Sequence, residues 1–69
     1  MRIYDVEQNG DGYYIVTANG VPCKASFQKP KKAWEHAEKL ATLYARVKGL
    51  RASFTTHPEG GARAAWVVK

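Results

Sequence analysis

Hydrophobic and polar residues alternate along three stretches in the first part of the chain, and two turn motifs separate these stretches. The stretches are RIYDVEQ (2–8), YYIVTA (13–18) and VPCKASF (21–27). The intervening NGDG (9–12) suits a hairpin loop that closes with a left-handed glycine. The NG pair (19–20) is typical of a two-residue type I′ turn, in which both central residues need positive φ. The pattern therefore predicts three antiparallel strands joined by two hairpins.

A helical period replaces the alternation between Ala33 and Val47. Pro30 suits a first helical turn because its missing N–H would be unpaired there, and Gly49 suits a left-handed cap at the end. Apolar residues recur at spacings of three and four, which makes one broad stripe on a helix. The stripe comprises Ala33, Trp34, Ala37, Leu40, Ala41, Tyr44 and Val47. The opposite face mixes acidic and basic residues, so we expect it to face water.

Two further alternating stretches follow the helix, LRASFTTH (50–57) and ARAAWVVK (62–69), with PEGG (58–61) between them as a turn. The predicted order is βββαββ, an α+β fold in which one helix packs on one face of an antiparallel sheet. We expect residues 1–69 to form a single domain. Because one helix covers only one face of a sheet, the far face is expected to be open or covered by a partner.

Hairpin geometry assigns the strand residues to the two faces of the sheet. The predicted pairs across the NG turn are Ala18 with Val21, Val16 with Cys23, and Tyr14 with Ala25. Leu50 and Phe54 are expected to join the core on the helix side, with Trp34 and Trp66 as its aromatic anchors. The far side is expected to be open and to carry mainly basic and polar residues, namely Tyr13, Ile15, Thr17, Lys24, Ser26, Gln28, Arg51, Ser53, Thr55, His57, Arg63 and Lys69, together with the carboxylates Asp5 and Glu7.

The charge balance favours an acidic partner. Eleven Lys and Arg against six Asp and Glu give a net charge of +5 and a pI near 9.6, which is typical of proteins that bind nucleic acid and also of a solubilising shell. Three lysines precede or begin the helix, where free N–H groups and the helix dipole favour anions. The candidate residues for binding nucleic acid or a partner are Lys24, Lys29, Lys31, Lys32, Arg51 and Arg63, with Tyr13 as a stacking residue.

Motifs for catalysis, cofactors or metals are not found in the sequence. It has no glycine-rich phosphate loop, nucleophile elbow or histidine–glutamate metal motif. His36 and His57 lack the spacing of a metal site, and the single cysteine, Cys23, is expected to pack in the interior. We therefore expect no enzymatic activity, no cofactor and no metal.

The sequence also bears on location. No apolar run approaches the ~20 residues of a membrane-spanning helix. The opening MRIYDVEQ lacks the apolar segment and cleavage pattern of a signal peptide. We expect the protein to act in the cytoplasm and not in a membrane.

Residues 12–41, GYYIVTANGVPCKASFQKPKKAWEHAEKLA, resemble the amino-terminal arm-binding domains of phage-type tyrosine integrases. In that family a basic F-x-x-x-K-x-A type of entry leads from three strands into a helix. The matching residues here are Phe27, Lys31 or Lys32, Ala33 and Ala37. The resemblance implies a sheet that enters a DNA groove, in a small phage or bacterial protein. The last two predicted strands have no counterpart at this position of the family, and the same order of elements also resembles small bacterial proteins without an assigned role.

Two functions from different classes follow from these observations. The first is a non-catalytic module that binds nucleic acid or a nucleoprotein complex through an open basic sheet face and the lysines before the helix. The alternative is a protein–protein interaction or inhibitor module, such as a phage-encoded anti-CRISPR-type protein that blocks a host defence complex. A homodimer formed through unprotected sheet edges is a third arrangement that the sequence leaves open.

Overall fold

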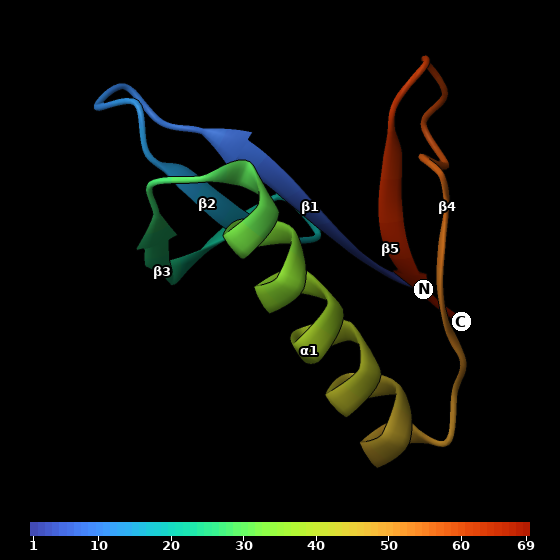
Figure 1. Cartoon of the computed structure of the whole chain (residues 1–69). Coiled ribbons are helices and arrows are strands. Elements are labelled where there is room, and N and C mark those ends of the chain that lie inside the picture. The colour runs from blue at the N-terminus through green and yellow to red at the C-terminus, as the bar shows by residue number, and fades with distance from the viewer.

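One helix packs on one face of a five-stranded antiparallel sheet, which confirms the predicted α+β fold (Figure 1). The computed structural model describes residues 1–69. The elements are β1 (Arg2–Gln8), β2 (Tyr14–Ala18), β3 (Val21–Phe27), α1 (Pro30–Lys48), β4 (Ala52–Thr56) and β5 (Ala64–Val68). The strand order is β3-β2-β1-β5-β4, so β1 lies at the centre and β3 and β4 form the edges. The single helix, α1, is not long and apolar enough to cross a membrane.

The two N-terminal hairpins form as the turn motifs predict, with one change of register. Asn19 and Gly20 both have positive φ, 51° and 84°, and Ala18 pairs with Val21. Tyr14 lies opposite Phe27 rather than the predicted Ala25, because the register shifts between Ile15 and Thr17. The shift follows Pro22, which has no N–H for the ladder; proline within sheets is confined to edges and bulges. The shift moves the pairing by two positions, so each residue of β3 keeps its predicted face.

Small helix residues bring α1 close to the sheet. The buried alanines of α1 are Ala33, Ala37, Ala41 and Ala45. They pack against Tyr4, Val16 and Val68, which come from three neighbouring strands. Nearer the end of the helix, the Arg2 guanidinium lies 4.1 Å from the centre of the Tyr44 ring. Arg2 also donates a hydrogen bond to the Tyr4 hydroxyl, which raises the pKa of its guanidinium above the usual value.

Four residues that the sequence pattern placed on the core side of the sheet or the helix lie largely at the surface. Val21 on the edge strand β3 is 66% exposed, and Val47 in the last turn of α1 is 72% exposed. Leu50 is 44% exposed and Phe54 is 54% exposed. Leu50 follows the helix cap, where Gly49 has φ 69° and the N–H of Leu50 donates to the carbonyl of Ala45. Phe54 lies on the edge strand β4, at the limit of the width that a single helix can cover. The predicted core is therefore wrong at these four positions.

The centre of the far face is covered by the chain itself, so the expectation of a fully open far face is wrong there. Strand alternation places Asp5, Thr17, Ala65 and Val67 on this face, and all four are buried. The connection between β4 and β5 reaches across to the same face, where His57 is 6% exposed and lies against Asp5. The margins of the far face and a cavity beside His57 remain accessible.

Candidate functional site

Five of the seven residues predicted to bind nucleic acid or a partner lie where β3 leads into α1. We call Tyr13, Lys24, Lys29, Lys31 and Lys32 the β3–α1 corner; all five are exposed. Lys24 lies three residues before the end of β3. Tyr13 precedes Tyr14, which pairs with Phe27, so it belongs to the same end of the sheet. An aromatic residue and four cations thus belong to the end of β3 and the start of α1; Lys24 lies on the far face of the sheet, whereas Lys31 also lines a hollow between α1 and β4.

The helix start at this corner has unpaired donors. Lys29 is the N-cap residue and makes no side-chain capping bond, and the first turn of α1 contains no acidic residue. The N–H groups of Lys31 and Lys32 belong to the set that lacks partners within a helix. Lys32 lies 3.8 Å from Glu35, but both side chains are mostly exposed, so this ion pair neutralises little. The corner is therefore a positively charged surface with backbone donors.

Arg51 and Arg63, the other two predicted residues, are not brought to this corner. Arg51 lies next to β4, the opposite edge of the sheet from β3, and its backbone pairs with Lys69. The Nη1 atom of Arg63 lies 3.2 Å from Oδ2 of Asp5, so an internal carboxylate offsets its charge.

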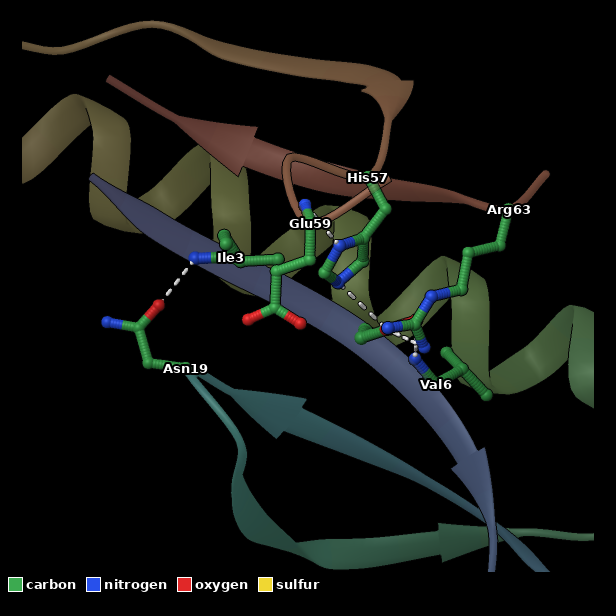
Figure 2. A network of polar contacts seen from close by, with 7 residues as sticks. Ile3, Val6, Asn19, His57, Glu59 and Arg63 are labelled. Atoms are coloured by element: carbon green, nitrogen blue, oxygen red, sulfur yellow. Dashed lines mark hydrogen bonds and ion pairs between the residues drawn. The ribbon is translucent and has the colours of Figure 1, made fainter. Parts of the chain in front are cut away.

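Asp5 is the centre of a polar network on the far face. Figure 2 shows its partners Val6, His57 and Arg63 around it. Its Oδ1 accepts the N–H of Val6 at 2.8 Å. Its Oδ2 lies 3.3 Å from Nε2 of His57 and 3.2 Å from Nη1 of Arg63. The carboxylate therefore joins β1 to both ends of the connection between β4 and β5.

The network lies where the ladder between β1 and β5 stops, after Tyr4 pairs with Trp66. The carbonyl of Ile3 accepts from Asn19 on the β2 side, and successive residues of a strand direct their backbone groups to opposite neighbours. The N–H of Val6 thus points toward β5 at a position where no ladder partner remains. Asp5 supplies the acceptor that the missing strand pair would have provided.

Both ring nitrogens of His57 are engaged. Its Nδ1 accepts the N–H of Glu59 at 3.1 Å, and its Nε2 lies 3.3 Å from Oδ2 of Asp5. The ring therefore presents no free nitrogen to a substrate. The sequence pattern assigned no role to His57 because its partner lies more than fifty positions away in the chain, on a strand whose neighbour the pattern does not specify.

A cavity of about 330 Å³ lies beside this network. Its lining includes the carboxylates Asp5, Glu7 and Glu59, the cation Arg63, and the polar residues Thr17 and Asn19. No three His, Cys, Asp or Glu side chains in the chain are arranged to hold a metal ion. The cavity is thus an acidic hollow on a basic protein, which the sequence pattern did not predict.

A second, shallower hollow of about 430 Å³ runs between α1 and β4. Trp34, Phe54 and Trp66 form its apolar part, which we call the aromatic groove. The ring centres of Trp34 and Phe54 are 5.4 Å apart in an edge-on arrangement, and those of Phe54 and Trp66 are 5.5 Å apart. The two tryptophans, predicted as core anchors, are half-buried and border this groove.

No protein-family model, curated protein or solved structure matches this chain. The similarity to arm-binding domains therefore stays a prediction that rests on the residues of 12–41.

Proposed function

We propose that the protein is a non-catalytic module that binds nucleic acid, alone or within a nucleoprotein complex, through the β3–α1 corner. The observation that carries the proposal is the uncapped helix start with exposed Lys29, Lys31 and Lys32, preceded by exposed Lys24 on β3 and by exposed Tyr13 at the same end of the sheet. Lysines neutralise phosphates, free N–H groups at a helix start donate to phosphate oxygens, and an exposed aromatic ring stacks on a base.

The proposed contact differs from the groove-inserted sheet that the integrase resemblance implies. Residues 57–63 cover the centre of the far face, and Asp5, Glu7 and Glu59 make that region acidic. Carboxylates repel phosphates, so the sheet centre is unsuited to a polyanion. The footprint is confined to the corner and the exposed part of β3, with Arg51 and Arg63 outside it.

The test measures direct binding to double-stranded DNA, single-stranded DNA and RNA. Fluorescence anisotropy reports the binding at each of several salt concentrations. The variant Lys29→Glu/Lys31→Glu removes the corner charge, and Lys39→Glu/Arg46→Glu makes the same charge change elsewhere on α1. We expect the first variant to lose binding and the second to retain most of it. Absence of binding to all three nucleic acids at low salt would refute the proposal.

A protein partner is the second candidate function, and the aromatic groove favours it. Phe54 is 54% exposed on β4, whose outer backbone groups have no strand neighbour. An extended peptide that pairs with such an edge places alternate side chains in the adjacent hollow, the arrangement expected of an interaction or inhibitor module.

Pull-down from a nuclease-treated host lysate separates the two candidates. Partners that survive nuclease and are lost with Phe54→Ser support the protein candidate, whereas loss of all partners after nuclease supports nucleic acid. Light scattering distinguishes a second copy of the chain from a foreign partner at the same edge.

A further inference from the structure

The cavity on the far face, called here the acidic cavity, concentrates negative charge in a basic chain. It contains three of the six carboxylates of the protein and one cation, Arg63. Asp5 is engaged by its three partners. The side chains of Glu7 and Glu59 form no ion pair or hydrogen bond within the chain, and the Glu59 carboxylate carries no contact in Figure 2. Two uncompensated carboxylates therefore line the cavity.

Thr17 provides a second, independent observation. It is 2% exposed and lies directly opposite Asp5 on the neighbouring strand. Its hydroxyl makes no hydrogen bond within the chain, yet no fully enclosed side-chain polar atom lacks a partner. The hydroxyl must therefore open into the cavity that Thr17 lines. A buried hydroxyl that faces a cavity and has no partner is a built acceptor for a ligand.

The arrangement of acceptors indicates the chemical class of the ligand. They come from β1, from β2 and from the connection after β4, and no three of the acidic, histidine or cysteine groups converge as metal ligands do. An ammonium group likewise directs its donors from one point, whereas a guanidinium distributes five N–H donors over a plane. We propose that the acidic cavity binds a guanidinium group, presented as the arginine side chain of a peptide.

The size of the cavity agrees with this ligand. A volume of about 330 Å³ lies at the lower end of the range for ligand sites, which suits one long side chain better than a drug-sized molecule. The site is formed by residues outside the β3–α1 corner. Its test is therefore independent of the proposed nucleic-acid binding.

The experiment is an NMR titration of the isotope-labelled full chain with small-molecule probes, in which the amide chemical shifts of the protein are measured. N-acetyl-L-arginine amide is the probe, N-acetyl-L-citrulline amide is its neutral isostere, and N-acetyl-L-lysine amide carries the same charge on an ammonium. We expect saturable shifts at Thr17, Asn19 and Glu59 with the arginine probe, weaker ones with lysine, and none that saturate with citrulline. Equal binding of citrulline, or of lysine, would overturn the assignment.

Isosteric variants locate the site. Glu7→Gln and Glu59→Gln are each expected to weaken the arginine probe about threefold to tenfold, while Glu35→Gln and Glu38→Gln, on the exposed face of α1, leave the affinity unchanged. Thr17→Val removes the unpaired hydroxyl and is likewise expected to weaken binding of the arginine probe. The amide spectrum of each free variant reports whether the fold is intact. Unchanged affinity in folded Glu7→Gln and Glu59→Gln, or shifts confined to α1, would contradict the proposal.

Discussion

Nε2 of His57 lies 3.3 Å from Oδ2 of Asp5, beyond the point where the ladder between β1 and β5 has ended. Arg63, directly across the hairpin from His57, reaches the same oxygen. Side chains thus continue the connection that backbone pairing begins. The contact joins the N-terminal strand to the C-terminal hairpin, so its removal should weaken the whole fold.

Asp5→Ala is expected to lower the free energy of unfolding by about 2–3 kcal/mol, because the buried His57 ring loses its partner and the Val6 N–H loses its acceptor. Chemical denaturation measures the loss. Glu7→Ala is the matched control, since Glu7 lies on the same strand and face but is exposed and unbonded; its effect should stay within about 0.5 kcal/mol. Similar losses for the two variants would show that the network contributes no stability.

Asp5 and His57 should be energetically coupled. In a cycle of Asp5→Ala, His57→Ala and the double variant, the double variant is expected to lose less stability than the two single losses combined. We expect a coupling energy of about 1 kcal/mol or more. Additive losses would mean that the two groups act independently.

Gly20→Ala is expected to cost about 1–2 kcal/mol, because Gly20 has φ 84° and a side chain there strains the left-handed backbone. No heavy atom lies within 4 Å of the position that the new Cβ would occupy, so the cost comes from conformation alone. Gly10→Ala is the control, with equally open surroundings and no positive φ. A loss of the same size at Gly10 would argue against this reason.

The corrected core predicts a clear contrast in thermal or chemical denaturation. Val16→Ala should cost about 2 kcal/mol, because Val16 is 0% exposed and packs between sheet and helix. Leu50→Ala should cost less than about 1 kcal/mol, since Leu50 is 44% exposed. A larger loss at Leu50 than at Val16 would contradict the surface position of Leu50.

Removal of corner lysines should change the salt dependence of DNA binding. For double-stranded DNA, Lys29→Ala/Lys31→Ala is expected to reduce the slope of log affinity against log salt by about 0.9 for each phosphate that the variant no longer neutralises. Lys39→Ala/Arg46→Ala should leave the slope nearly unchanged. Anisotropy titrations over several salt concentrations measure both, and equal slopes would place the DNA-binding surface elsewhere.

Local pattern was enough to predict the hairpins, the helix and the faces of the strands. Asn19 and Gly20 set the turn between β2 and β3, and the alanines of α1 mark the side that meets the sheet. The four lysines of the corner belong to one short stretch of sequence, 24–32, which runs from β3 into the first turn of α1. Their place along the chain was therefore predictable, but the faces of the molecule on which their side chains lie were not.

The order of strands was not predictable from the pattern. Alternation assigns Asp5 and Arg63 to one face, but it does not specify which strands are neighbours, and the contact between them requires β5 to lie beside β1. His57 could not be recognised as buried without that neighbour. The acidic cavity could not be predicted for the same reason, because its lining combines Asp5 and Glu7 of β1 with His57, Glu59 and Arg63 from near the other end of the chain.

The sheet consists of two parts, β3-β2-β1 and β5-β4, which are joined by a ladder of only three residue pairs, from Arg2 with Val68 to Tyr4 with Trp66. Beyond this ladder the Asp5 carboxylate connects the two parts through His57 and Arg63. We expect hydrogen exchange to show that the two parts separate locally at Asp5, at a lower free energy than global unfolding. Such an opening would expose more of the far face while α1 stays packed on the sheet.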